Sequence, residues 1–112
     1  MIYPGEIYFL SAAAGARPVI VVSREELNRG NYVTAVPCTS QKFAVRSKLP
    51  NCVPFVAGQF GFSVDCVAQC EYILAIRKAD IDFSMGLIGT LDDATLRDVG
   101  KAIGYVIECD CE

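Results

Sequence analysis

The sequence predicts a small, mainly β protein with helices (class α+β), in which short strands curl into a compact barrel and one amphipathic helix packs on it. Three observations support this prediction: short apolar segments separated by turn-forming residues, four consecutive β-branched residues at 19–22, and a helical apolar stripe near the C-terminal end. With 112 residues, of which 53% are apolar, the chain is expected to form a single domain over residues 1–112.

Glycine, proline and small polar residues separate six segments predicted as strands, at residues 5–10, 17–23, 32–39, 52–56, 63–71 and 85–91. The run Val19–Val22 fits a strand that is buried on both faces, because it has no polar residue to place in solvent. The connections are a small-residue loop at 11–16, a polar segment at 24–31 that fits one helical turn at 25–28, a basic loop at 40–50 and a glycine-bearing reversal at 57–61. Residues 76–82 are ambiguous and are compatible with a helical turn.

The final element is a predicted helix that begins after Asp92, a good N-cap residue, with Asp93 in the first turn. Its apolar stripe follows the helical spacing and consists of Leu96, Val99, Ile103, Val106 and Ile107. Gly100 and Gly104 lie one turn apart within it, which favours a close backbone approach to the sheet or to a partner subunit.

Six cysteines are present, none in a Cys-x-x-Cys pair, and the chain has no histidine. Neither a metal site nor a cofactor is therefore expected. Three of the cysteines lie in apolar or alternating segments and are predicted to be small core residues: Cys38, Cys66 and Cys70. Cys109 and Cys111 lie on a polar tail and are predicted to be exposed.

No apolar run approaches the roughly 20 residues that span a bilayer, and no signal peptide is visible, so we expect a cytoplasmic protein without a membrane partner. The net charge of −3 is unevenly distributed, with a balance of +3 over residues 1–48 and −6 over residues 49–112. A surface that binds phosphates is expected in the first half. The same basic residues also fit ordinary solvated loops.

Three segments resemble the MazF/PemK toxin family of type II toxin–antitoxin systems. Residues 5–9 (GEIYF) are similar to the family's opening strand, residues 17–23 (RPVIVVS) to its Arg-Pro-Val strand, and residues 33–40 (VTAVPCTS) to the strand that ends in Pro-x-Thr-Ser or Pro-x-Thr-Thr. Weaker similarity continues through residues 27–29, 49–50, 61–67 and 88–93.

The resemblance implies an SH3-like barrel of the CcdB/MazF type that forms a homodimer, cleaves single-stranded RNA and is neutralised by a cognate antitoxin. By motif matching, the family's catalytic arginine corresponds to Arg17 and its catalytic threonine to Thr39. RNA is cleaved when its 2′-hydroxyl attacks the adjacent phosphate, leaving a 2′,3′-cyclic phosphate and a 5′-hydroxyl. A guanidinium suits the charge on that phosphate, and a threonine hydroxyl can donate to it; neither needs a metal.

Further polar residues flank these two and are candidates for binding RNA: Arg24, Asn28, Arg29, Ser40, Gln41 and Lys42. A solvated-loop role is equally compatible with each of them. Glu6, on the first predicted strand, is a carboxylate to consider near the predicted site, but we assign no general base.

Two features depart from the family pattern. The loop at 11–16 is short and apolar, and Tyr72, Leu74 and Ala75 stand where many members have Gln, Arg and Thr. Two functions follow as hypotheses: an endoribonuclease toxin, or a non-catalytic binding module on the same fold. The second class includes a gyrase poison and a degenerate toxin that only binds an antitoxin.

Overall fold

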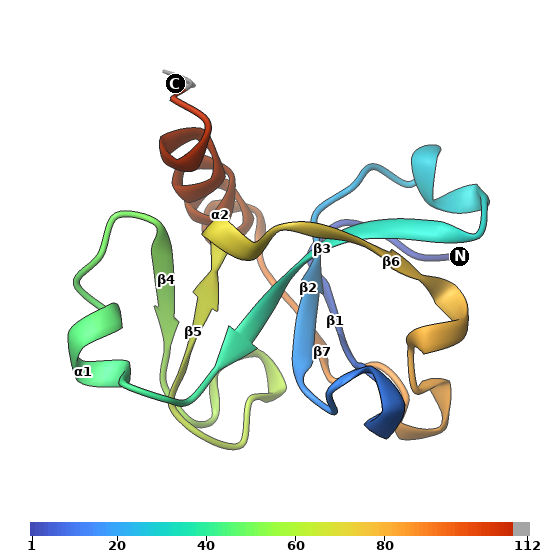
Figure 1. Cartoon of the computed structure of the whole chain (residues 1–112), viewed down its shortest axis with the longest axis horizontal. Helices are drawn as coiled ribbons and strands as arrows, with labels where there is room; N and C mark the ends of the chain where they lie inside the picture. Colours follow the sequence, from blue (N-terminus) through green and yellow to red (C-terminus); the bar gives the residue numbers. More distant parts are fainter. Residues whose placement is uncertain (109–112) are drawn as a thin grey trace.

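The computed structural model describes residues 1–108. It confirms the predicted class, since a curled antiparallel sheet is combined with helical segments and a C-terminal helix (Figure 1). The strands are β1 (Glu6–Phe9), β2 (Pro18–Val21), β3 (Tyr32–Thr39), β4 (Cys52–Phe55), β5 (Cys66–Gln69), β6 (Leu74–Arg77) and β7 (Gly89–Thr90). The helices are α1 (Phe43–Arg46) and α2 (Asp93–Val106). Six 3-10 turns join them: η1 (Ala12–Ala14), η2 (Leu27–Arg29), η3 (Gln59–Gly61), η4 (Cys70–Tyr72), η5 (Lys78–Asp80) and η6 (Phe83–Met85).

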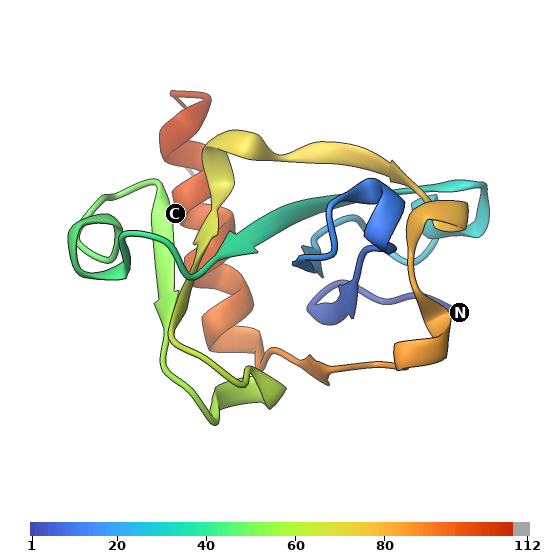
Figure 2. The same ribbon diagram turned by 60° about the horizontal axis from the view of Figure 1, so that its bottom comes forward.

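Strand β3 holds the sheet together because it pairs with three other strands. Its first half, residues 32–35, lies beside β6, its middle, residues 35–37, beside β2, and its last two residues beside β5. The remaining strands extend the order β4-β5-β3-β2-β1-β7, and every pairing is antiparallel. The long β3 thus crosses from one half of the curled sheet to the other (Figures 1 and 2).

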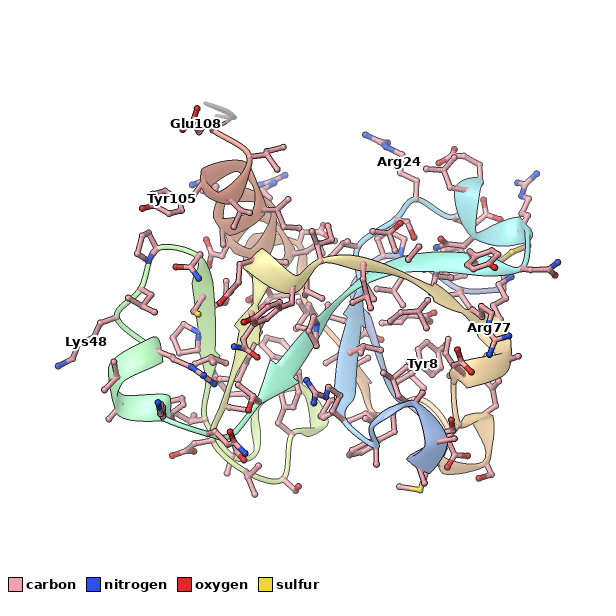
Figure 3. The ribbon with its side chains drawn as sticks, viewed as in Figure 1. Tyr8, Arg24, Lys48, Arg77, Tyr105 and Glu108 are labelled. Carbon is pink, nitrogen blue, oxygen red and sulfur yellow. The ribbon has the colours of Figure 1, made fainter. Side chains whose placement is uncertain are left out.

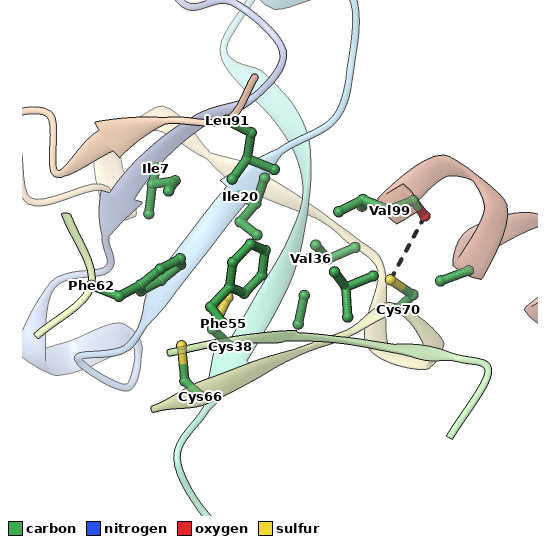
Figure 4. Packing of buried hydrophobic residues seen from close by; sticks show 13 residues of the cluster. Ile7, Ile20, Val36, Cys38, Phe55, Phe62, Cys66, Cys70, Leu91 and Val99 are labelled. Carbon is green, nitrogen blue, oxygen red and sulfur yellow. Dashed lines mark hydrogen bonds between the residues drawn. The ribbon is translucent and has the colours of Figure 1, made fainter. Parts of the chain in front are cut away.

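The β-branched run on β2 is buried on both faces, as predicted. Ile20 packs into a core cluster with Val36, Phe55 and Val99 beneath helix α2 (Figure 4). Val19 and Val21 point to the opposite face, where the second core cluster includes Tyr8, Val33 and Ile76. Because consecutive side chains of a strand alternate between faces, two apolar clusters require a strand without polar alternation.

Helix α2 begins as expected. The Oδ1 atom of Asp92 accepts a hydrogen bond from the Thr95 N–H at 2.7 Å. The expected close approach to the sheet does not occur at Gly100, because nothing within the chain lies within 4 Å of the position that its Cβ would occupy; an approach to a partner subunit stays a prediction. Gly104, one turn later, is buried. Within residues 1–108, no helix combines the length and apolarity needed to cross a bilayer.

Other differences from the predicted elements occur where few side chains are buried. The basic loop contains the short helix α1, and strand β6 forms where no strand was predicted. In β6 only Ile76 is buried, so the sequence carries too little apolar periodicity to reveal it. The segments predicted as strands at 63–71 and 85–91 shorten to β5 and β7. The helical turns expected at 25–28 and within 76–82 occur as η2 and η5.

Asn28 is a buried polar residue that ties three segments together. Its side chain is 1% exposed. The Nδ2 group donates to the backbone oxygens of Ile2 at 3.0 Å and Ser23 at 2.9 Å, and Oδ1 accepts from the Ser23 hydroxyl. The Oγ atom of Ser23 in turn accepts from the Thr34 N–H at 2.9 Å. Every polar atom of the Asn28 side chain is therefore used inside the fold.

We predict that Asn28→Ala lowers the free energy of unfolding by about 1–3 kcal/mol, because it leaves two buried carbonyls without their donors. Asn31→Ala is the matched control: Asn31 is exposed and contributes only its backbone carbonyl, which accepts from Lys78 N–H at 2.8 Å. Urea unfolding of both variants measures the difference. Equal losses would show that the Asn28 network contributes nothing specific.

Turn η3 lies beside β7, and two glycines make this close approach possible (Figure 2). A Cβ atom on Gly61 would overlap the carbonyl of Ile88, and one on Gly89 would overlap the carbonyl of Phe60. Gly61 also has a positive φ of +88°. Gly58 has a similar φ of +96°, but open space surrounds the position of its missing Cβ.

Comparing Gly58 with Gly61 distinguishes the cost of backbone strain from the cost of steric overlap, because both have a positive φ but only Gly61 has atoms close to the position of its missing Cβ. We expect Gly58→Ala to cost about 1–2 kcal/mol of stability through its left-handed backbone alone. Gly61→Ala is expected to cost about 1–3 kcal/mol more, because the added methyl group has no space beside β7. Thermal or urea unfolding of the two variants provides the comparison. A Gly61→Ala variant no less stable than Gly58→Ala would contradict the close approach.

Candidate functional site

The pairing of β2 with β3 brings the two predicted catalytic residues to the same end of the sheet. Val19 is paired with Pro37 at the end of this ladder, and Arg17 lies two residues before Val19 whereas Thr39 lies two residues after Pro37. Strand β3 ends and β2 begins on the same side of the sheet (Figure 1). The backbone of Arg17 is itself held, since its carbonyl accepts from the Leu10 N–H at 3.0 Å. Two residues that are 22 positions apart in sequence thereby reach the same end of the sheet.

Arg17 and Thr39 both line a pocket of about 290 Å³. Its polar lining also includes Ser40, Gln41 and Ser63, and its apolar lining includes Phe62. The pocket is bounded by the ends of β2 and β3 and by the segment between η3 and β5. A guanidinium and several hydroxyls around an apolar floor suit a phosphodiester with part of its nucleoside.

The functional groups of Arg17 and Thr39 remain free for a ligand. Thr39 Oγ1 accepts a hydrogen bond from the Gln41 N–H at 3.2 Å, which leaves the threonine O–H free to donate. Arg17 is exposed. Among residues 1–108, the only ion pairs join Arg29 to Glu25 and Arg77 to Asp80, so Arg17 does not face a carboxylate.

Two cysteines form part of the pocket wall, next to the end of β3. Cys38 and Cys66 are 2% and 3% exposed, and Cys38 directly precedes Thr39. A hydrogen bond to Cys66, together with burial, raises the pKa of the Cys38 thiol well above its ordinary value. Cys70 packs nearby, and its Sγ atom lies 3.9 Å from the carbonyl of Val99 (Figure 4).

The prediction that Cys38, Cys66 and Cys70 are core residues is therefore confirmed. Cys109 and Cys111 lie outside the described residues. Over the part of the chain that the structure describes, no group of three or more metal-ligating side chains is close enough to hold an ion.

The basic loop supplies the residues next to Thr39. Ser40 and Gln41 line the pocket, and Lys42 follows them, exposed, with a positive φ of 54° just before α1. The loop is connected to α1, because Arg46 Nη1 donates to the Gln41 carbonyl at 3.3 Å. The predicted RNA-binding residues of this loop are thus placed at or beside the site.

Arg24, Asn28 and Arg29 are not brought to this pocket. Arg24 follows β2 at the strand end opposite to Arg17 and projects away from the sheet (Figure 3). Arg29 lies in η2 and pairs with Glu25 at 3.2 Å, and Asn28 is the buried network residue described above. Glu6 is also engaged, because its Oε1 accepts from the Tyr3 N–H and the Tyr8 hydroxyl.

A second pocket, of about 480 Å³, adjoins the first, and Arg17 lines both. Tyr72 and Leu74, which depart from the family pattern, lie on its wall. Sequence reasoning noted these residues only as a loss of polar groups. Their position beside Arg17 depends on the pairing of β6 with β3, which the sequence did not reveal.

The fold is shared with solved structures of other proteins. The chain is similar to the Mycobacterium tuberculosis toxin MazF-mt6, with 27% identity over 95% of this chain and 99% of the other, at a TM-score of 0.78. Its fold also matches an endoribonuclease in complex with its cognate antitoxin from a mycobacterial species (18% identity, all of both chains, TM-score 0.79). A third match is the MazE–MazF complex from Deinococcus radiodurans (18% identity, 97% of each chain, TM-score 0.75).

No curated protein sequence matches this chain significantly. In contrast, the model of the family described as PemK-like, MazF-like toxin of type II toxin–antitoxin system matches residues 3–107, which include both Arg17 and Thr39. A match of this extent, on a fold shared with MazF structures, shows that the chain belongs to the PemK/MazF-like toxin family.

Proposed function

We propose that this protein is a metal-independent endoribonuclease that cleaves single-stranded RNA in the cytoplasm, with Arg17 and Thr39 as its catalytic residues. The observation that carries the proposal is that both residues line one pocket, at the end of the sheet to which the antiparallel pairing of β2 with β3 brings them. Family membership and the similarity to endoribonuclease structures support the same activity.

In the proposed reaction, the scissile phosphate lies between the Arg17 guanidinium and the Thr39 hydroxyl. The 2′-oxygen forms a new bond to phosphorus and loses its proton, while the bond from phosphorus to the 5′-oxygen breaks and the 5′-oxygen gains a proton. Arg17 donates hydrogen bonds to the phosphate oxygens, on which negative charge increases in the transition state. The products are a 2′,3′-cyclic phosphate and a 5′-hydroxyl.

The hydrogen bond that Thr39 accepts gives its hydroxyl a defined direction. Because Gln41 N–H occupies one lone pair of Oγ1, the O–H has few competing orientations and is available to a phosphate oxygen. Ser40 and Gln41 lie where side chains can contact the same nucleotide. Lys42 adds an exposed positive charge beside the pocket, which suits contact with the RNA backbone.

We further propose that the toxin domain, residues 1–112, acts as a homodimer and is neutralised by an antitoxin protein. The proposal rests on the family and on solved relatives that are complexes with antitoxins.

The activity is tested with purified protein and single-stranded RNA in EDTA. We expect Arg17→Ala to reduce kcat/KM by about 100- to 1,000-fold, because one preorganised charged donor to the transition state is lost. Thr39→Ala is expected to lower the rate as well, and both variants should unfold at wild-type urea concentrations. Arg97→Ala, on the exposed face of α2, is the matched control for loss of a positive charge and should cleave normally.

End-group analysis completes the test. Products that carry 2′,3′-cyclic phosphate and 5′-hydroxyl ends support the proposed chemistry. If the wild-type protein leaves varied RNAs intact in EDTA, the proposed endoribonuclease activity is wrong and the non-catalytic binding module is favoured.

A further inference from the structure

We propose that the second pocket is a nucleobase subsite, in which a base adjoining the cleaved phosphate stacks on Tyr72. The inference rests on the proposed function, because it takes the RNA strand to pass Arg17. It goes further by naming the residue that binds a neighbouring base and the kind of contact that it makes.

The two pockets share one lining residue, Arg17. Arg17 lines the pocket that contains Thr39 and also lines the second pocket. A phosphate held by Arg17 therefore lies at the junction of two cavities, and its two flanking nucleosides have one cavity each. The second cavity, of about 480 Å³, is large enough for one nucleobase.

The lining of the second pocket is mostly apolar. The floor is apolar and consists of Leu10, Val19 and Pro37, and Tyr72 and Leu74 complete the wall. Besides Arg17, Glu71 is the only charged residue among residues 1–108 that lines this pocket, and its carboxylate would repel a phosphate. An apolar cavity with an aromatic ring and one carboxylate suits a base, whereas the phosphate stays with Arg17 at the junction.

Tyr72 has an exposed side chain on an anchored backbone. Its side chain is 59% exposed, so the ring is available to a ligand. Its backbone is anchored nevertheless: Tyr72 ends turn η4, whose first residue, Cys70, is fully buried and donates its N–H to the Asn51 carbonyl at 3.1 Å. A ring on a fixed backbone loses little entropy when it stacks, which favours binding.

An aromatic residue also explains how the site functions without the polar residues that many relatives have here. Stacking on a tyrosine is tolerant of sequence, since every base has a π face. We therefore infer that this chain positions the neighbouring nucleotide by its ring face and not by a charged contact.

The test compares two substitutions with one matched control. Tyr72→Ala should raise KM about 5- to 100-fold and leave kcat nearly unchanged, as expected for the loss of one base–aromatic stack. Tyr72→Phe keeps the ring and should cleave like the wild type. Tyr105→Ala is the control: Tyr105 is 60% exposed on α2, away from both pockets (Figure 3), and its removal should leave KM unchanged.

Abasic substitution identifies the stacked base directly. In a substrate with a known cleavage position, each nucleotide next to the cleaved phosphate is replaced in turn by an abasic ribose. One such position should raise KM for the wild type by about the same factor as Tyr72→Ala, and that penalty should disappear when the substrate is assayed with Tyr72→Ala. Independent, multiplying effects at every position would overturn the subsite.

The outcomes also distinguish this inference from the proposed activity. A wild type that cleaves RNA, together with a Tyr72→Ala variant of unchanged KM, refutes the subsite and leaves the endoribonuclease standing. A wild type that does not cleave refutes the activity itself. Sedimentation of Tyr72→Ala tests one further outcome. If the variant is a monomer where the wild type is a dimer, and its KM is unchanged, Tyr72 is an interface residue that contacts a second copy of the chain. The proposed base subsite is then wrong.

Discussion

The pairing of β3 with β2 is the constraint on which the rest of the structure depends. Antiparallel hydrogen bonding fixes which residues of two strands lie opposite each other, and a slip of one residue would turn every side chain to the other face. Here the register is fixed by burial on both sides, because Ile20 belongs to one core cluster and Val19 and Val21 to the other. The position of Arg17 and Thr39 at one pocket follows from that packing.

Two buried cysteines belong both to the apolar core and to the pocket wall. The thiols of Cys38 and Cys66 lie between the apolar cluster and the pocket wall, adjacent to Thr39. Small, weakly polar side chains fill this space without leaving an unpaired buried donor, which a hydroxyl or an amide would risk. The strand end that carries the threonine is thus packed against the core, whereas its hydroxyl and the Arg17 guanidinium remain free.

The two ends of β2 have different roles although both carry arginine. At the end next to the pocket, Arg17 has no carboxylate partner among the described residues, so its charge is available to a phosphate. At the other end, the polar segment after β2 is a structural connection. Asn28 there is used by the backbone of residues 2 and 23, and Arg29 is paired with Glu25. A charged residue that is close to β2 in sequence is therefore not necessarily close to the pocket in space.

The sequence by itself determined the class of fold, the doubly buried strand β2, the capped C-terminal helix and the buried cysteines, because each depends on local apolar periodicity. It also indicated Arg17 and Thr39, through family resemblance. It did not reveal β6, the short helix α1, the internal role of Asn28 or the position of Tyr72 beside Arg17. These features depend on pairings between residues distant in the chain, and strand register, helix packing and the burial of a polar group are decided only when the sheet closes.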